Sequence, residues 1–201
     1  MSTDELSNYL KIINTYNNIE YLFSTIMYSA GPTLTKEKAA SLLIFSNDRR
    51  NLQKDWERFK DEVKDKLRVK FLELKKDQKS TVVLFYNEEI LKKVLREEGN
   101  VEFLENFGYK KGMTLKESLS LLKDRYKESC PHEIGIFLGY PLDDVAHFME
   151  DTKENCKLVG YWKVYSNIEE AKNIFEKYDS IRNDFVRIMV SGVKPTEIFR
   201  R

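Results

Sequence analysis

Two strand-like segments joined by a short polar link place the strongest constraint on the fold of this chain. Arg68–Leu74 carries apolar side chains at a period of two, and Thr81–Tyr86 is rich in β-branched and aromatic residues. Both patterns are typical of strands, and the link Lys75–Ser80 predicts that they pair as an antiparallel hairpin. A third strand is predicted only at Leu158–Tyr165, after about 70 further residues, and this spacing favours a segregated α+β fold over alternating βαβ units.

Helical periodicity accounts for most of the remaining chain. From Asp4 to Tyr28 apolar residues recur at helical spacing, and we expect Asn14–Asn18 to divide two helices and Gly31-Pro32 to end the second. Further helices are predicted at Lys36–Phe45, Asp48–Lys66, Asn87–Glu97 and Asn100–Gly108, from a capping box at Thr114 and Glu117, twice between Pro131 and Met149, and from Asn167 towards Ser191.

The predicted architecture is a single α+β domain of residues 1–201. About eight helices pack around a small, mostly antiparallel sheet of three strands. Residues 1–30 form an N-terminal helical segment, residues 130–165 a helix–turn–helix–strand unit, and residues 167–190 a C-terminal helix.

Composition narrows the class of protein. The 34 basic and 33 acidic residues leave a net charge of +1, which argues against bulk attachment to nucleic acid or anionic lipid. No apolar run reaches the ~18 residues that span a bilayer, and the N-terminus lacks a signal-peptide pattern. With two cysteines there is no disulfide framework. We therefore expect a cytoplasmic protein without nucleic-acid partner or membrane insertion, whose partner is a small molecule or another protein.

The segment from Pro131 to Met149 superficially resembles a DNA-binding helix-turn-helix. Two short helices are predicted on either side of a tight turn at Gly139-Tyr140-Pro141. The second helix, however, begins with Asp143 and Asp144, whose carboxylates would repel phosphate in a DNA groove. An acidic first turn has a simpler cause, because it complements the helix dipole. DNA binding is therefore disfavoured.

The two cysteines and two histidines of the chain all lie between residues 130 and 156. Thiolate and imidazole are typical zinc ligands and also suit iron or haem, so His132, Cys130 and Cys156 are candidate metal ligands. Their spacing matches no metal motif, which leaves separate, packed side chains as the alternative. A nucleophilic pair of Cys130 and His132 is a third interpretation.

Aromatic residues near the third predicted strand offer a stacking surface. Tyr161 and Trp162 could stack on a flat ligand, although aromatic residues on a strand are also typical of a core. Together with His132, Cys130 and Glu133 they are the candidate ligand-binding residues. No phosphate-binding glycine loop, nucleophile elbow or zinc-protease motif is present, so no catalytic residue is predicted.

Three hypotheses for function follow. The leading one is a non-enzymatic ligand-binding protein. The others are a protein–protein adaptor acting through the surface of residues 130–165, and a small-molecule enzyme with a polar pocket beside His132.

A family resemblance extends over most of the chain. The string CPHEIGIFLGYPLDDV from Cys130, and NC..VGYWKVY ending at Tyr165, resemble the family of domains of unknown function DUF3793, found in clostridia and other anaerobes. GPTL, KAASLLIFS, LFY and FGY extend the likeness from about Tyr21 to Tyr178.

The family has no established activity. Its association with iron-uptake and flavodoxin-like genes implies a haem, tetrapyrrole or iron-related ligand in an anaerobic bacterium. Where the family pattern reads NC..CGYW, this chain has Val159, so the second cysteine of that pair is missing.

Overall fold

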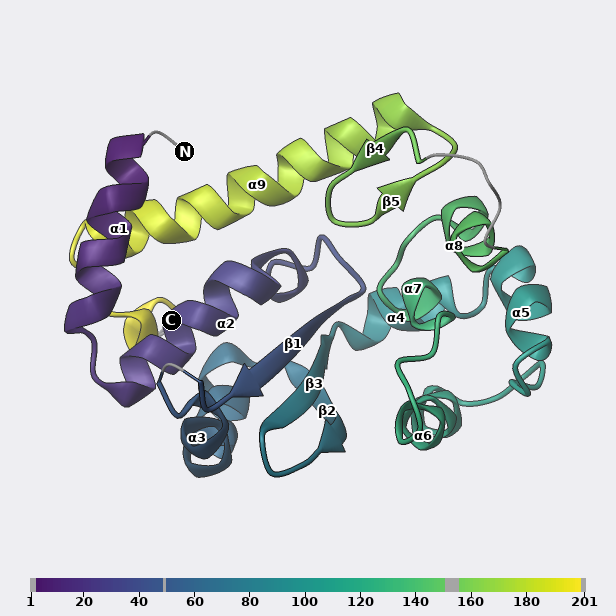
Figure 1. Cartoon of the computed structure of the whole chain (residues 1–201), viewed down its shortest axis with the longest axis horizontal. Coiled ribbons are helices and arrows are strands. Elements are labelled where there is room, and N and C mark those ends of the chain that lie inside the picture. Colours follow the sequence, from purple (N-terminus) through teal and green to yellow (C-terminus); the bar gives the residue numbers. More distant parts are fainter. Residues whose placement is uncertain (1–2, 49, 151–155, 200–201) are drawn as a thin grey trace.

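The computed structural model describes residues 3–48, 50–150 and 156–199, which form an α+β fold (Figure 1). Its main sheet has three antiparallel strands in the order β1-β3-β2, with β1 at Ala40–Ser46, β2 at Lys70–Lys76 and β3 at Ser80–Tyr86. Strands β2 and β3 pair in register from Lys70 opposite Tyr86, with one bulge near Lys75. The predicted fold class and the predicted hairpin are both confirmed.

The third strand of the sheet comes from a segment predicted to be helical. The prediction of a helix at Lys36–Phe45 is wrong, because β1 pairs with the whole of β3, from Ala40 opposite Tyr86 to Ser46 opposite Ser80. A short apolar run such as Leu42–Phe45 fits a buried strand as well as a buried helix turn. Pairing with the apolar strand β3 decides between them.

The segment Leu158–Tyr165 does not join this sheet, so the prediction of one continuous strand there is wrong. It forms a separate hairpin of two short strands, β4 at Leu158–Val159 and β5 at Lys163–Val164. The chain turns at Gly160, where an added Cβ would lie 2.1 Å from Cε2 of Phe175. This close approach requires glycine, and glycine interrupts the strand.

Nine α-helices and one short 3-10 helix complete the described part of the chain. They are α1 (Thr3–Thr15), α2 (Asn18–Leu34), α3 (Leu52–Leu67), α4 (Glu88–Val94), α5 (Glu98–Glu105), α6 (Leu115–Tyr126), α7 (Ile134–Phe137), α8 (Leu142–Met149), α9 (Ile168–Val190) and the 3-10 helix η1 (Pro195–Glu197). The predicted break between α1 and α2 is confirmed, with Asn17 as the N-cap of α2. Asn87, Thr114 and Asn167 cap α4, α6 and α9 through their side chains, as their positions predict.

Helix α3 begins at Leu52 rather than at Asp48, and two further predicted helix boundaries are wrong. Helix α2 continues through Pro32 to Leu34, although proline cannot donate to the carbonyl of Tyr28 four residues earlier. That carbonyl instead accepts a hydrogen bond of 2.9 Å from Nε of Arg182 on α9, so it is not left unpaired. Asn100 lies inside α5 rather than capping it, and its Nδ2 donates to the Val94 carbonyl at 2.9 Å.

The main sheet is buried on both faces, which explains the uninterrupted apolar run of β3. Val83 and Phe85 face a core formed with α1, α2, α3 and α9, whereas Val82 and Leu84 face a second core formed with α4 to α8. A smaller third cluster joins the β4–β5 hairpin to α9. Tyr140 packs against both the second and the third cluster, so the segment after α7 lies where they meet.

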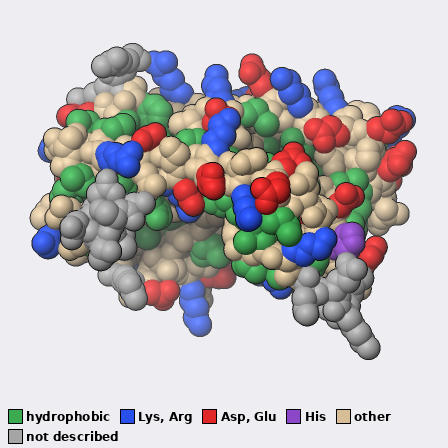
Figure 2. All heavy atoms as spheres, turned by 90° about the horizontal axis from the view of Figure 1, so that it is seen from above, with side chains coloured by type: hydrophobic (Ala, Val, Ile, Leu, Met, Phe, Trp, Pro, Cys, Tyr) green, Lys and Arg blue, Asp and Glu red, His purple; other side chains and the backbone are tan. Residues whose placement is uncertain are grey.

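The surface is mixed in charge. On the face shown in Figure 2, Lys and Arg side chains are interspersed with Asp and Glu. Within the described ranges, none of the helices combines the length and the apolar character needed to cross a membrane.

Candidate functional site

An apolar cavity of about 400 Å³ lies beside the segment that carries the cysteine and histidine residues. Its walls come from the stretch leading into α7, from α8 and from the β4–β5 hairpin, and include His132, Leu138, Tyr140, Val145, Phe148 and Trp162. Three predicted ligand residues, Cys130, His132 and Trp162, therefore line one cavity. Residues 151–155 of the predicted 130–165 unit lie outside the described residues.

A single buried carboxylate, that of Asp144, holds the hairpin against α8. Its Oδ2 accepts a hydrogen bond of 2.7 Å from Nε1 of Trp162. Its Oδ1 accepts from the backbone amides of Tyr165 and Ser166, at 2.8 and 3.0 Å, and from the Ser166 hydroxyl at 3.0 Å. Asp144 is thus more than a charge complementing the dipole of α8, and its oxygens are committed to fixing the position of Trp162.

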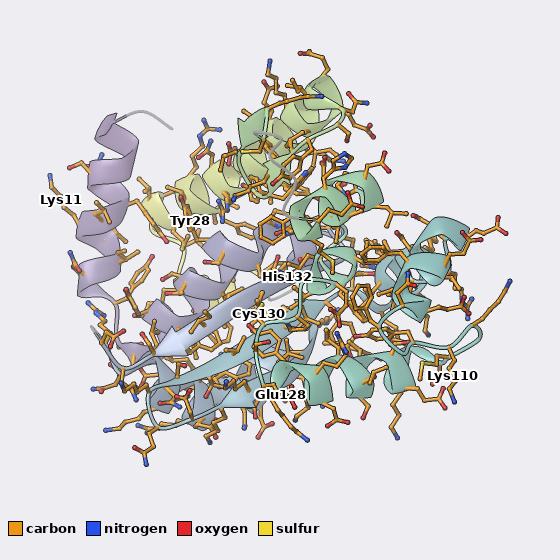
Figure 3. The ribbon with its side chains drawn as sticks, turned by 45° about the vertical axis from the view of Figure 1, so that its right-hand side comes forward. Lys11, Tyr28, Lys110, Glu128, Cys130 and His132 are labelled. Atoms are coloured by element: carbon orange, nitrogen blue, oxygen red, sulfur yellow. The ribbon has the colours of Figure 1, made fainter. Side chains whose placement is uncertain are left out.

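His132 lies at the rim of the cavity. Its exposed ring packs edge-to-face against Phe148, with ring centroids 5.4 Å apart. Cys130 and His132 lie close together between α6 and α7 (Figure 3), and both also line a more polar neighbouring groove. Within the described ranges the imidazole of His132 makes no hydrogen bond, so its ring nitrogens are free to meet a ligand.

The structure gives no support to a metal site formed by Cys130, His132 and Cys156 together. Cys130 is exposed and lies near the Tyr126 hydroxyl. Cys156 is half-buried at the start of the hairpin and does not line the cavity. Among residues 3–48, 50–150 and 156–199, no three His, Cys, Asp or Glu side chains come close enough to hold a metal ion. What remains for a ligand is the single imidazole of His132.

The other histidine, His147, lies on α8 and outside the lining of the cavity. Its ring stacks on Tyr165, with centroids 5.8 Å apart, and Nδ1 lies 2.7 Å from the Asp143 carbonyl oxygen. His147 therefore offers a matched control for substitutions at His132.

Glu133, a predicted ligand residue, is buried and engaged elsewhere. Its side chain is 1% exposed and forms an ion pair with the guanidinium of Arg125. The Tyr109 hydroxyl donates to the same carboxylate oxygen at 3.4 Å. Burial, together with the nearby Glu133 charge, raises the pKa of Tyr109. This arrangement anchors α7 to α6, and Glu133 does not line the apolar cavity.

Tyr161 likewise points away from the cavity and packs on α9. Its hydroxyl donates to Oδ1 of Asp179 at 2.8 Å, and its ring contacts Tyr178. Tyr140, Tyr161 and Tyr178 surround the ammonium of Lys38, with ring centroids 5.2, 5.9 and 5.9 Å from Nζ. Nothing in the sequence distinguishes Lys38 from the other basic residues, because the three tyrosines come together only in the folded chain.

The Lys38 cage predicts a pH dependence of stability. Burial, followed by repulsion from Arg182, lowers the pKa of Lys38 from 10.5 to about 8. Between these values the unfolded chain binds more protons than the folded one, so the free energy of unfolding rises with pH. Relative to Lys38→Met, the wild type should gain about 2 kcal/mol between pH 8 and pH 10. Urea denaturation at several pH values measures the free energy of unfolding of both proteins. The same change of that free energy with pH in wild type and Lys38→Met would contradict the prediction.

The fold and the cavity together define an α+β protein with an aromatic-lined apolar cavity, bordered by one unpaired imidazole. A family model described as "Protein of unknown function (DUF3793)" matches residues 26–199. The chain therefore belongs to this family, as its signature strings indicate, and the match includes every residue of the cavity. Neither the search of curated proteins nor the search of solved structures found a match.

Sequence reasoning missed most of the cavity wall. Leu138, Tyr140, Val145 and Phe148 carry no chemical signature that distinguishes them from core residues. The signal that was available is the pair Val145 and Phe148, three residues apart on one face of α8.

Proposed function

We propose that the protein is a cytosolic, non-enzymatic ligand-binding protein whose site is the apolar cavity beside His132. The observation that carries this proposal is the aromatic lining of a cavity of about 400 Å³, a volume typical of small-molecule sites. Tyr140 stacks on Trp162 with ring centroids 5.1 Å apart, and Phe148 closes the cavity beside His132. Flat aromatic walls favour a flat, largely apolar ligand.

A tetrapyrrole such as haem is the ligand class that these residues fit best. Haem iron already has four ring nitrogens, so it needs few protein ligands, and a single histidine serves this role in globins and peroxidases. His132 supplies one imidazole at the rim, and Lys163 beside Phe148 supplies a cation for a peripheral carboxylate. A bare iron or zinc ion would need the three-ligand group that the described residues lack.

The lining argues for binding rather than catalysis. Asp144 is the cavity's one carboxylate among the described residues, and all its hydrogen bonds run to the hairpin and the residues after it. A general acid or base needs a proton-accepting group within reach of substrate. Asp144 is already used in holding Trp162, and the imidazole of His132, which can also accept a proton, has no hydrogen-bond partner among the described residues to orient it. Both observations favour the non-enzymatic hypothesis over the small-molecule enzyme.

A protein–protein adaptor is the second candidate. Phe148 and Val159 are large apolar side chains exposed on the same unit of the chain. Exposed apolar residues mark a partner surface where they form one contiguous patch. A partner docked there would be lost on Val159→Asp, whereas binding of a tetrapyrrole in the cavity would be unchanged.

Titration with protoporphyrin IX tests whether the cavity accepts a tetrapyrrole ring without relying on iron. We expect saturable, stoichiometric quenching of the tryptophan fluorescence in the wild type, because Trp162 lines the cavity. In Phe148→Asp a charge replaces part of the apolar wall, and affinity should fall about tenfold, equivalent to about 1.4 kcal/mol. The side chain of Phe148 is 44% exposed, so the substitution leaves the fold intact.

The matched control is Leu10→Asp on α1. Leu10 is 49% exposed and does not line the cavity, so its affinity for protoporphyrin IX should equal that of the wild type. Non-saturating quenching in the wild type, or an equal loss in both variants, would contradict the proposed site.

A further inference from the structure

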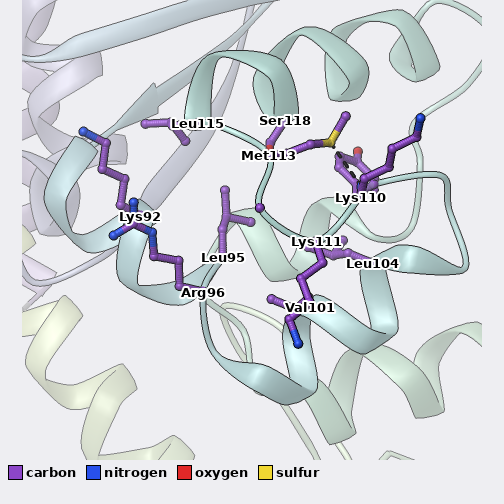
Figure 4. Close-up of a pocket in the computed structure, with 12 residues that line it drawn as sticks. Lys92, Leu95, Arg96, Val101, Leu104, Lys110, Lys111, Met113, Leu115 and Ser118 are labelled. Atoms are coloured by element: carbon purple, nitrogen blue, oxygen red, sulfur yellow. Dashed lines mark hydrogen bonds between the residues drawn. The ribbon is translucent and has the colours of Figure 1, made fainter.

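A second cavity, of about 350 Å³, lies among α4, α5 and α6 and shares no lining residue with the apolar cavity. Four cationic side chains line it (Figure 4). Lys92 belongs to α4, Arg96 to the turn after it, and Lys110 and Lys111 to the turn before α6. In the view of Figure 4, Lys92 and Arg96 lie on one side of Leu95 and the other two on the opposite side.

These cations meet little counter-charge. Nζ of Lys92 lies 2.6 Å from Oε1 of Glu88, a carboxylate that a second lysine shares. Arg96, Lys110 and Lys111 form no ion pair within the described ranges, and none of the described residues that line the cavity is acidic. The whole chain carries a net charge of only +1, so the excess is local. A concave surface lined by one sign of charge concentrates counter-ions.

The floor of this cavity is apolar. Leu104 is buried, and Leu95, Val101 and Met113 are half-buried, between the cations. A free inorganic ion would leave this surface exposed to water. A ligand that satisfies both parts of the cavity therefore has an anionic group and an apolar body.

The turn before α6 adds backbone donors to the cationic side chains. Gly112 has a φ of +85°, and Lys111 and Gly112 both line the cavity. Within the described ranges, their backbone amides donate no hydrogen bond. Successive free amides in a turn form a concavity that binds anions.

We propose that this cavity binds a small organic phosphate, a molecule with a phosphate ester group and an apolar body. A phosphate ester carries a charge of about −1.5 to −2 at neutral pH, so it can pair with several cations at once. The guanidinium of Arg96 offers two parallel donors to phosphate oxygens. This inference does not depend on the ligand of the apolar cavity.

Calorimetric titration at low salt with phenyl phosphate, inorganic phosphate and phenol measures how much the phosphate group and the apolar body each contribute to affinity. We expect phenyl phosphate to bind at least tenfold more tightly than inorganic phosphate, and phenol to bind weakest. Raising the salt concentration should weaken the binding of phenyl phosphate, because Arg96, Lys110 and Lys111 are exposed. Equal affinity for phenyl phosphate and inorganic phosphate would overturn the proposal.

The double variant Arg96→Gln and Lys111→Gln removes two cavity cations from exposed positions. It should weaken the binding of phenyl phosphate about tenfold or more. The control is the double variant Lys93→Gln and Lys116→Gln, which makes the same change in net charge at exposed residues outside the cavity lining. A similar loss in the control would show a general charge effect and overturn the assignment to this cavity.

Discussion

Asp144→Ala is expected to lower the free energy of unfolding by roughly 3 kcal/mol, since a carboxylate that accepts four hydrogen bonds is lost from a buried position. Asp144 is 2% exposed, and its donors are the Trp162 indole, the backbone amides of Tyr165 and Ser166, and the Ser166 hydroxyl. Without the carboxylate, the indole and one or more amides would remain unpaired beside the cavity. Urea denaturation followed by circular dichroism measures the loss.

Asp143→Ala is the matched control for this prediction. Asp143 is the neighbouring acidic residue in the first turn of α8, but its side chain is exposed. Its removal should cost no more than about 0.5 kcal/mol, the contribution of a charge to the helix dipole. Equal stability of the two variants would show that Asp144 acts only as a dipole charge. That result would remove the support for a fixed Trp162.

Glu133→Ala is expected to lower the free energy of unfolding by roughly 2 to 3 kcal/mol, because it breaks a buried ion pair. Its partner Arg125 is 35% exposed, so water can hydrate the freed guanidinium and limit the loss. Tyr109 would also lose the acceptor of its hydroxyl. The affinity for protoporphyrin IX should remain within about twofold of the wild type, since Glu133 does not line the apolar cavity.

Glu128→Ala provides the comparison for Glu133. Glu128 is exposed and lines the same polar groove, so its loss should change stability by less than about 0.5 kcal/mol. A stable Glu133→Ala protein that no longer binds the tetrapyrrole would contradict the purely structural role of Glu133. It would show that Glu133 contributes to ligand binding.

The local signals of the sequence predict the fold well where the chemistry is local. The hairpin of β2 and β3, the break between α1 and α2, and the caps at Asn87 and Thr114 depend on neighbouring residues, and all are confirmed. Strand β1 depends on a partner about 40 residues away in sequence, so its apolar run alone could not distinguish strand from helix. The continuation of α2 through Pro32 depends on Arg182, a residue of the last helix.

In the candidate site, too, local residue type predicts some features, whereas others depend on contacts between distant parts of the chain. Cys130, His132 and Trp162 have distinctive side chains, and the structure brings all three to one cavity. Tyr161 and Glu133 have equally distinctive side chains, but Asp179 and Arg125 engage them away from it. Burial and pairing of this kind are properties of the folded chain. They cannot be predicted from residue type alone.

The most direct test of the proposed function is the absorption spectrum of the protein titrated with ferric haem. The wild type and His147→Ala should bind one equivalent and show the shifted Soret band of haem coordinated by an imidazole. In His132→Ala that band should be lost, although protoporphyrin IX still binds in the apolar cavity. A wild-type spectrum identical to that of free haem, or an unchanged Soret band in His132→Ala, would contradict the account.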